Sequence, residues 1–363
     1  MYRDHTVGVV VPAYNEARFV GDVIETVPAY VDRIYAVDDG STDDTWEEIK
    51  RSARRINATD NGVDERFDQR VVPIQHGSNR GVGGAIKTGY ERARDDRIDV
   101  TAVMGGDGQM RAGELQVVLD PIVEDRADYV KGNRLARPAT RADMPRFRLF
   151  GNRLLSAFTR VASGYWGIGD PQNGYTAISL AALDAVAIED MYEFYGYCND
   201  LLVKLNVEGM RVADVPRCCN YADEESHIRY STYIPRVSWM LGRNFCWRLR
   251  EQYLRKEPGL TGTGYGLGIL TAGFGAVLAA IEAITGGPRS RGVTNALRGV
   301  LAGLLLFAAA AALEHRANDD LSVQVDCRPI GMPEPAGEHG RDRPAEDGTP
   351  LGAENADPRP TDD

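Results

Sequence analysis

An acidic side chain inside a glycine-rich turn is the first feature of this sequence that could do chemistry. Asp107 stands in residues 105–109 (GGDGQ), directly after an apolar run, residues 100–104, that is typical of a buried strand. The neighbouring glycines have no Cβ atom, so a ligand can approach the backbone closely. A carboxylate in this place suits Mg²⁺ or Mn²⁺ bound to a diphosphate, because hard cations prefer carboxylate and phosphate oxygens. A tight turn with a solvated aspartate is the alternative.

Two further strand-like runs end in acids that could share a site with Asp107. Residues 7–13 (VGVVVPA) precede Glu16, and residues 34–38 precede Asp39. Strand-like runs and helical patterns alternate along the first half of the chain, which predicts a doubly wound α/β domain. Ligands of such domains bind at the carboxyl ends of the strands. We therefore expect Glu16, Asp39 and Asp107 to meet in one crevice.

Six motifs, in this order, make the sequence resemble the family 2 glycosyltransferases, which are inverting enzymes of the nucleotide-sugar-binding type called GT-A. The resemblance is to the dolichyl-phosphate hexosyltransferases in particular, such as dolichyl-phosphate mannose and glucose synthases. The motifs are VVVPAYNE at 9–16, VDDGSTDDT at 37–45, NRGVGGAIKTGY at 79–90, MGGDGQM at 104–110, KGNR at 131–134 and DPQNGYTAIS at 170–179. The resemblance covers residues 5–255 and implies a GT-A fold, a Rossmann-like mixed α/β sheet.

The resemblance also implies roles for single residues. Those that match the family's nucleotide-binding set are Pro12, Tyr14, Glu16 and Asp39. Asp39 is expected at the base or ribose, while Asp107 and Gln109 match the residues that bind the diphosphate and its metal ion, Mg²⁺ or Mn²⁺. Most relatives have the first acid of an Asp-x-Asp pair where this chain has Gly105. One carboxylate fewer leaves the affinity and the identity of the metal open.

An arginine-rich stretch, residues 131–155, would suit an acceptor that carries a phosphate. Guanidinium groups bind phosphate oxygens through two parallel hydrogen bonds. By the resemblance, Arg134, Arg148 and Asn152 bind the phosphate of a lipid acceptor. A salt-bridged surface helix is the alternative for Arg148.

Asp170, in the turn-rich segment 170–175, completes the catalytic residues that the resemblance implies, together with Asp107 and Arg134. We expect it to orient groups or balance charge beside the donor sugar, with an Asx turn as the alternative. Asp200 is a lesser candidate. The glycine-rich segment at 81–84 lacks the Gly-Lys-Ser/Thr of a Walker A loop, so it is expected to allow close packing of a helix or of a ligand.

Composition excludes some classes of protein and indicates an environment. The net charge of -11 disfavours a nucleic-acid partner. Only five of the 42 basic residues are lysine, which indicates a salt-adapted, haloarchaeal surface. The N-terminus shows no signal-peptide pattern, so the front of the chain is expected in the cytosol.

The second half of the chain points to a membrane. Residues 1–230 are predicted to form the cytosolic catalytic domain, and residues 231–257 an amphipathic interfacial helix or, alternatively, a core-packed one. Residues 258–315 are predicted as a hairpin of two transmembrane helices, and residues 316–363 as an acidic disordered tail. Basic residues before the hairpin favour a multi-pass cell-membrane protein with a cytoplasmic catalytic domain.

These features together predict a transferase that moves a hexose from a nucleotide sugar to dolichyl phosphate with inversion, for protein N-glycosylation. UDP-glucose is the favoured donor and GDP-mannose the second. A family 2 transferase with a non-lipid acceptor is one rival, although a processive enzyme is disfavoured because no Gln-x-x-Arg-Trp motif occurs. A catalytically silent membrane scaffold that binds nucleotide sugar is the other.

Overall fold

The computed structural model describes residues 1–59, 66–134, 146–216, 230–256, 258–285 and 291–325. An eight-stranded mixed sheet organises the described residues, with the strand order β3-β2-β1-β4-β6-β5-β7-β8. The strands are β1 (Val7–Ala13), β2 (Arg33–Asp38), β3 (Val71–Gln75), β4 (Val100–Val103), β5 (Tyr129–Asn133), β6 (Thr176–Ser179), β7 (Val212–Pro216) and β8 (Ser322–Gln324). β6 is antiparallel to its neighbours β4 and β5, and all other neighbouring strands are parallel.

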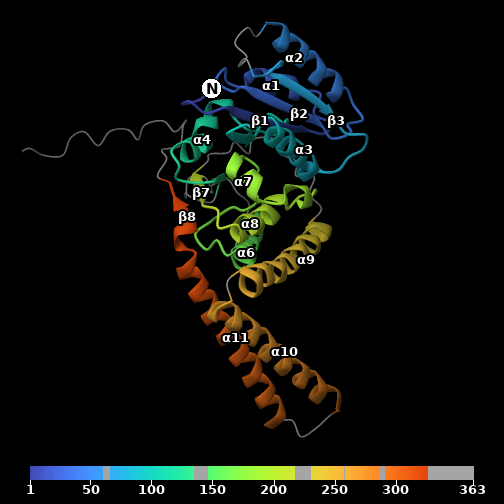
Figure 1. Ribbon diagram of the computed structural model, residues 1–363. Coiled ribbons are helices and arrows are strands. Elements are labelled where there is room, and N and C mark those ends of the chain that lie inside the picture. The colour runs from blue at the N-terminus through green and yellow to red at the C-terminus, as the bar shows by residue number, and fades with distance from the viewer. Residues whose placement is uncertain (60–65, 135–145, 217–229, 257, 286–290, 326–363) are drawn as a thin grey trace, which may run out of the picture. The chain divides into compact units, whose positions relative to one another are not determined.

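Helices cover both faces of this sheet (Figure 1). They are α1 (Val20–Thr26), α2 (Thr45–Thr59), α3 (Val82–Asp95), α4 (Leu115–Val123), α6 (Arg146–Ser163), α7 (Leu180–Ala185) and α8 (Tyr197–Val207). Side chains of β1 alternate between two cores: Val9 and Val11 pack with α1, α2 and α4, whereas Val10 packs with α3. Since both faces are buried, the strand has no polar alternation. The mixed α/β fold expected from the sequence is confirmed.

The direction of β6 decides which loops share an edge of the sheet. β1, β2, β4 and β5 all point the same way, so the loops that follow them lie at one edge. Because β6 runs in the opposite direction, the loop that precedes it, residues 170–175, lies at that same edge. Segments separated by more than a hundred residues are thereby brought together.

The long helix α9 (Tyr230–Leu249) packs its apolar face against the domain. Val237, Met240 and Leu241 are buried in a cluster with residues of α6 and α8. The opposite face is exposed and carries Trp239, which is 77% exposed, and Arg243. The core-packed alternative therefore holds for the apolar face, and only the face with tryptophan and arginine is open to a lipid surface.

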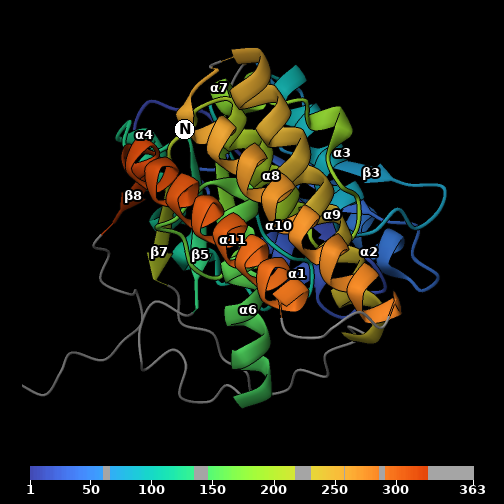
Figure 2. The same ribbon diagram turned by 90° about the horizontal axis from the view of Figure 1, so that it is seen from below.

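Two apolar helices, α10 (Leu260–Thr285) and α11 (Arg291–Ala317), form the hairpin that the sequence predicted. They run side by side in both ribbon views (Figures 1 and 2). Residues 260–284 and 294–317 are long and apolar enough to cross a membrane and are only 11% and 17% buried. Gly268 and Gly303 lie where α10 and α11 approach closely, since a Cβ atom on either would meet the partner's backbone at 2.8 and 2.3 Å.

A buried ion pair joins the hairpin to α9. Arg248 of α9 donates from Nη1 to Glu314 Oε1 of α11 at 2.5 Å, and both side chains are fully buried. Glu314 also accepts hydrogen bonds from the hydroxyl groups of Tyr253 and Tyr265, both at 2.8 Å. A charge buried near the end of an apolar helix is therefore both paired and hydrogen-bonded, as its burial requires.

The predicted boundary of the C-terminal tail at residue 316 is wrong. α11 continues to Ala317, and Ser322–Gln324 form β8, which pairs in parallel with Val212–Asp214 of β7. Val323 and Val325 pack at the edge of the core that contains Val9 and Val11. Their alternation is a weak strand pattern, and the acidic residues around it made the strand hard to predict. In sequence, the hairpin is therefore inserted between two neighbouring strands of the sheet. The remainder of the predicted tail lies outside the described residues.

Candidate active site

Hydrogen bonds cross-link the loops that follow β1 and β2. The backbone N–H of Asn15 donates to Ser41 Oγ at 2.9 Å, and that of Thr42 donates to Asn15 Oδ1 at 2.8 Å. The N–H of Glu16 donates to Thr45 Oγ1 at 2.8 Å. Asn15 has a φ of 57°, a left-handed conformation that asparagine tolerates better than most residues. This arrangement holds the half-buried Glu16 at the edge of the sheet, beside the exposed Tyr14.

The Asp107 loop leans on the end of β1. The N–H of Gly106 donates to the carbonyl of Pro12 at 3.0 Å, and a Cβ atom at Gly106 would lie 3.0 Å from that oxygen. Glycine is needed there because the two backbones are so close. Asp107 is half-buried and Gln109 is exposed, and the Gln109 N–H donates to Asp107 Oδ1 at 3.1 Å. The loop that carries Asp107 and Gln109 thus contacts the strand that carries Pro12, and their predicted roles stay predictions.

Asp39 is more deeply engaged than its predicted role requires. Its buried carboxylate accepts hydrogen bonds from the N–H groups of Arg80 at 3.0 Å and Gly81 at 2.7 Å. It also contacts His76 Nδ1 at 2.7 Å, and His76 Nε2 lies 2.9 Å from Thr88 Oγ1. Asp39 therefore orders the start of α3, and its contact with a base or ribose stays a prediction.

Arg134 and Asp170, predicted separately, form one buried ion pair. Arg134 donates from Nε to Asp170 Oδ2 at 2.7 Å and from Nη2 to Oδ1 at 3.0 Å. Burial would raise the pKa of Asp170, but the charge and hydrogen bonds of Arg134, with the charge of Lys131, outweigh it and lower the pKa below its usual value. Asp170 is therefore ionised at neutral pH and fixes the direction of the Arg134 guanidinium.

A second buried ion pair, Lys131 with Asp214, holds the residue next to Asp170 in place. Lys131, 1% exposed, donates from Nζ to Asp214 Oδ1 at 2.7 Å and also to the carbonyl of Gly169. Asp214 Oδ2 accepts hydrogen bonds from Asn133 Nδ2 at 2.8 Å and from the Gly169 N–H at 2.5 Å. These bonds hold the residue before Asp170, and Asp170 itself has a φ of 34°. The 170–175 loop is therefore fastened to β5 and β7.

An apolar groove of about 90 Å³ lies between α6 and α9, next to the 170–175 loop. Its lining residues are Gly151, Asn152, Leu154, Leu155, Phe158, Gln172, Tyr233, Ile234, Val237 and Ser238. Gln172 donates from its side chain to the Tyr233 hydroxyl group, which ties the loop to α9. Asn152, a predicted acceptor residue, therefore lines this groove, whereas the side chain of Arg148 lies outside the described residues.

Comparisons with known proteins decide the family. The model for "Glycosyl transferase family 2" matches residues 8–186. A UDP-N-acetylglucosamine–dolichyl-phosphate N-acetylglucosaminyltransferase of Methanococcus voltae is 30% identical over 214 residues, which are 59% of this chain and 85% of the relative. The chain belongs to glycosyl transferase family 2. The predicted enzyme class, a glycosyltransferase, is confirmed.

Two further comparisons place this family 2 glycosyltransferase among its relatives. A dolichyl-phosphate beta-glucosyltransferase of Trichomonas vaginalis is 24% identical over 226 residues, covering 57% of this chain and 61% of the relative. Among solved structures, mannosyl-3-phosphoglycerate synthase from Rubrobacter xylanophilus matches with a TM-score of 0.48 and 19% identity. That match covers 70% of this chain and 77% of the other.

The candidate metal ligands of this glycosyltransferase suit a metal ion that is also bound by the diphosphate of the substrate. Within the described ranges, no three Asp, Glu, His or Cys side chains gather as a metal cluster. Asp107 contributes a carboxylate and Gln109 a side-chain amide, and a Cβ atom at Gly105 would lie only 3.0 Å from Asp107 Oδ1. Mg²⁺ is commonly held by one or two carboxylates together with substrate phosphates. The residues therefore fit Mg²⁺ or Mn²⁺ shared with the donor.

The sequence analysis missed Tyr195, which lies on a loop held by the glycine-rich segment. A Cβ atom at Gly83 would meet the backbone of Tyr192 at 2.4 Å, and the Gly84 N–H donates to the Glu193 carbonyl at 2.9 Å. These glycines thus allow close packing of protein backbone. Tyr195 has an exposed side chain, but part of its surface is covered. This partial burial is the largest cause that raises its pKa, and the nearby charges of Asp107 and Glu16 raise the pKa further.

The location of Tyr195 near two predicted donor-site acids makes it a further candidate for the site. The glycines at 81, 83 and 84 could have indicated that another backbone segment packs against them. They could not have indicated that this segment contains Tyr195. Glu193 also accepts hydrogen bonds from Arg80 at 2.6 Å and Lys87 at 3.1 Å, which fixes the loop from a second side.

Asp200, the lesser candidate, does not lie with the others. Its buried carboxylate accepts hydrogen bonds from Lys204 Nζ and Asn244 Nδ2, both at 2.6 Å, and from the Tyr192 N–H at 3.0 Å. These contacts join α8 to α9 away from the groove that Asn152 lines. Asp200 therefore belongs to a different part of the molecule.

Proposed function

We propose that this family 2 glycosyltransferase transfers a hexose from a nucleotide sugar to dolichyl phosphate, with inversion at the anomeric carbon and for protein N-glycosylation. Two relatives support the acceptor, since the names of the Methanococcus and Trichomonas enzymes both include dolichyl phosphate. UDP-glucose is the first donor to test and GDP-mannose the second. UDP-N-acetylglucosamine joins them because the Methanococcus relative is named for it.

The observation that carries this proposal is the groove between α6 and α9. Its lining divides into polar side chains, among them Asn152 and Gln172, and apolar ones, among them Leu154, Phe158 and Ile234. Phe158 is 50% exposed and Ile234 53% exposed, so apolar surface is open to a ligand. An acceptor with a phosphate head and an isoprenoid chain matches this division.

The proposed reaction needs little acid–base chemistry from the protein. A phosphate monoester is largely ionised near neutral pH, so its oxygen can attack the anomeric carbon without losing a proton first. The bond from that carbon to the diphosphate oxygen breaks, and the nucleoside diphosphate leaves with the electron pair. Arg134, oriented by Asp170, is proposed to bind the acceptor phosphate and align the attacking oxygen.

The donor side of the mechanism rests on Asp107 and Gln109. These two side chains would hold Mg²⁺ or Mn²⁺, which when bound neutralises charge on the departing diphosphate. Pro12, Tyr14, Glu16 and Asp39 are proposed to position the nucleotide, and Tyr195 to contact the donor. All of them border the edge where the Asp107 loop meets the end of β1; for Asp39, the N–H donates to the carbonyl of Ala13, the last residue of β1, at 2.8 Å.

We further propose that the catalytic domain lies on the cytoplasmic side of the cell membrane. Basic residues flank the candidate spans on the domain side: Arg250, Arg255 and Lys256 precede α10, and Arg316 ends α11. Such residues are enriched on the cytoplasmic side. Arg289 and Arg291, which lie between the two candidate spans in the sequence, would weaken this charge difference, and their side chains lie outside the described ones.

A transfer assay on the full chain tests the function. Purified protein is incubated with dolichyl phosphate, Mn²⁺ and one labelled donor at a time: UDP-glucose, UDP-N-acetylglucosamine or GDP-mannose. We expect label in a charged glycolipid from one donor. Transfer only to a soluble acceptor alcohol would favour the non-lipid rival, and nucleotide-sugar binding without transfer would favour the scaffold.

A matched pair of variants tests the groove. Phe158→Ala removes a half-exposed ring that lines it, and Phe274→Ala removes an exposed ring of α10 that does not. We expect Phe158→Ala to raise the KM for dolichyl phosphate about tenfold, because the lost apolar contact is worth roughly 1.4 kcal/mol of binding free energy. The KM for the donor should be unchanged. An equal effect of the two variants would remove the groove from the acceptor site.

A further inference from the structure

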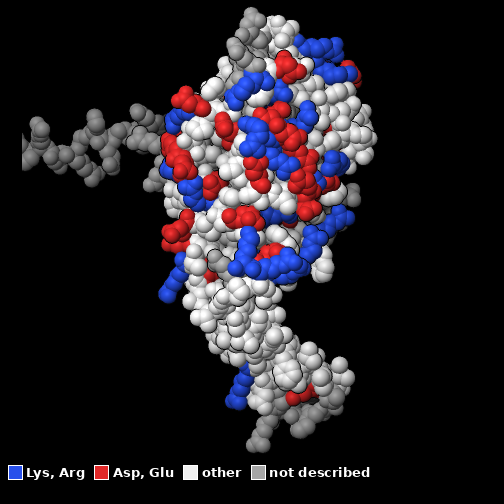
Figure 3. Space-filling view, in the orientation of Figure 1, with Lys and Arg blue, Asp and Glu red and all other residues white. Residues whose placement is uncertain are grey.

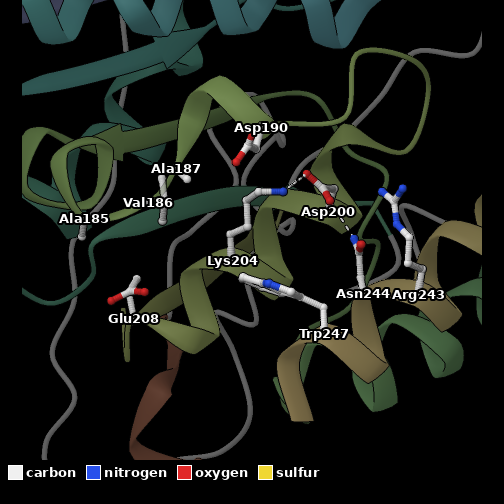
Figure 4. A pocket seen from close by; sticks show the side chains of 10 residues that line it. All are labelled: Ala185, Val186, Ala187, Asp190, Asp200, Lys204, Glu208, Arg243, Asn244 and Trp247. Atoms are coloured by element: carbon white, nitrogen blue, oxygen red, sulfur yellow. Dashed lines mark hydrogen bonds and ion pairs between the residues drawn. The ribbon is translucent and has the colours of Figure 1, made fainter. Parts of the chain in front are cut away.

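A second cavity lies on the other side of α9 and is not used by the proposed reaction. It measures about 350 Å³ and is enclosed by the end of α7 with the residues after it, by α8 and by α9. Its lining residues are Ala185, Val186, Ala187, Asp190, Asp200, Lys204, Glu208, Arg243, Asn244 and Trp247. Figure 4 shows that these residues come from three separate segments and that the side chains of Lys204, Asp200 and Asn244 point toward one another. It shares no lining residue with the acceptor groove.

The floor of this cavity is electrically balanced. Lys204 and Asp200 form an ion pair at 2.6 Å, and Asn244 supplies a second donor to the same carboxylate (Figure 4). Asp200 is 1% exposed and Asn244 is 6% exposed. The positive charge of Lys204 is therefore balanced by Asp200, and Lys204 attracts an anionic ligand only weakly.

The cation that remains to meet a ligand is Arg243. Among the described residues, no carboxylate lies within ion-pair distance of its guanidinium, although its side chain is exposed at the cavity wall. Trp247, one helical turn further along α9, adds an indole that is 38% exposed. Asp190 stands across the cavity from Trp247 (Figure 4). An arginine and an indole suit a phosphate with an adjoining organic group, and a carboxylate suits hydroxyl groups that donate to it.

One lining residue of the cavity is tied to the segment that leads into the first candidate membrane span. Glu208 is paired at 2.8 Å with Lys256, four residues before Leu260, where α10 begins. Figure 3 shows Lys and Arg side chains along the border between the charged surface and the mostly uncharged hairpin. Tryptophan, arginine and lysine are the side chains found at the interface between lipid and water.

We propose that this cavity binds the headgroup of an anionic phospholipid, with Arg243 on the phosphate, Trp247 against the glycerol backbone and Asp190 accepting hydrogen bonds from headgroup hydroxyl groups. A phosphoglycerol headgroup has this combination of one phosphate and a diol. Such a lipid is a structural ligand of the membrane-bound protein and not its acceptor substrate. The inference does not rest on the proposed transfer reaction, because no residue of the cavity takes part in it.

A binding titration on the delipidated full chain in detergent tests this site. The probes are dihexanoyl phosphatidylglycerol, dihexanoyl phosphatidylcholine and glycerol 1-phosphate, followed by tryptophan fluorescence and by lipid retention in native mass spectrometry. The variants are Arg243→Gln and its matched control Arg236→Gln, an exposed arginine two turns earlier on the same helix that does not line the cavity.

We expect Arg243→Gln to weaken binding of the phosphatidylglycerol about tenfold, as the loss of a charge-assisted phosphate contact implies, and Arg236→Gln to weaken it less than twofold. The phosphatidylcholine should bind at least several-fold more weakly. Equal losses in the two variants would mean diffuse attraction to basic residues and would overturn the site. Equal binding of both lipids would overturn the headgroup assignment. Binding of glycerol 1-phosphate as tight as that of the lipid would overturn the lipid and leave a soluble phosphate ester.

Discussion

Two sets of acids stand at the same edge of the sheet, and their surroundings differ. Asp107 and Glu16, on the proposed donor side, are half-buried at the tips of β4 and β1. Asp170 and Asp214, on the proposed acceptor side, face away from solvent and are bound to Arg134 and Lys131 by short charged hydrogen bonds. The first set lies where a cation and a diphosphate can reach it. The second set holds two cations of the protein itself in place.

The difference teaches that an acid near a site need not act on the substrate. Removing one partner of a buried ion pair leaves an unpaired charge in an apolar environment, which costs about 3–5 kcal/mol. Removing a carboxylate at a partly exposed loop costs far less stability. Substitutions on the donor side should therefore reduce activity without unfolding the protein, and substitutions of the buried pairs should do both.

The largest effect is expected from Asp107→Ala. Loss of the carboxylate that is proposed to bind the metal ion of the diphosphate should reduce kcat for transfer about 1000-fold, the size found when one preorganised charge-stabilising group is removed. The thermal midpoint should change little, because Asp107 is half-buried on a loop. Activity is measured with the labelled-donor assay and stability by thermal unfolding in detergent. Near-normal turnover would erase the distinction between the two sets of acids.

The next effect is expected from Asp170→Asn. Asparagine tolerates the φ of 34° at this position, so the change removes mainly the charge. We expect a loss of about 3 kcal/mol in the free energy of unfolding, together with reduced transfer, because Arg134 is no longer oriented. The matched control is Asp184→Asn, which removes the charge of an aspartate in a surface ion pair. Asp39→Asn would not serve as a control, because Asp39 is buried as Asp170 is.

The same variant gives a pH signature. The pKa of Asp170 is lowered in the folded protein from its ordinary value of 3.8, so its contribution to stability is complete above that pH. It is lost as the pH falls from there through the lowered folded value. Wild-type stability should therefore fall in this acid range more steeply than that of Asp170→Asn. Parallel stability curves of the two proteins would show that the ion pair adds nothing.

The smallest effect, and the sharpest test of the donor side, is expected from Gly105→Asp. A side chain at this position begins 3.0 Å from Asp107 Oδ1, so a second carboxylate would stand beside the first after a small adjustment. We expect binding of Mn²⁺ without nucleotide to become about tenfold tighter, because a cation gains one hard oxygen ligand. Electron paramagnetic resonance of free Mn²⁺ measures this. Gly105→Asn is the control of equal size, and an equal gain in both variants would exclude a charge effect.

Much of the donor side could be predicted from local patterns. An apolar run that ends in glycine and acid indicates a buried strand followed by an open loop, and three such runs indicated one edge with Glu16, Asp39 and Asp107. The two apolar helices were predictable for the same reason, since length and composition decide whether a segment can cross a membrane. The family model then confirmed the family that the motifs indicated, and the roles of the three acids stay predictions.

The chain's own order of residues determined its fold class, its strand tips, its acidic loops and its apolar hairpin, because each of these depends on residues close together in sequence. Only the tertiary structure decided that Arg134 meets Asp170, because this contact requires β6 to run against its neighbours. The tertiary structure also decided which face of α9 is open and that Ser322–Gln324 return to the sheet. Contacts of this kind depend on strand order and on packing across long stretches of chain, and no local pattern of residues contains that information.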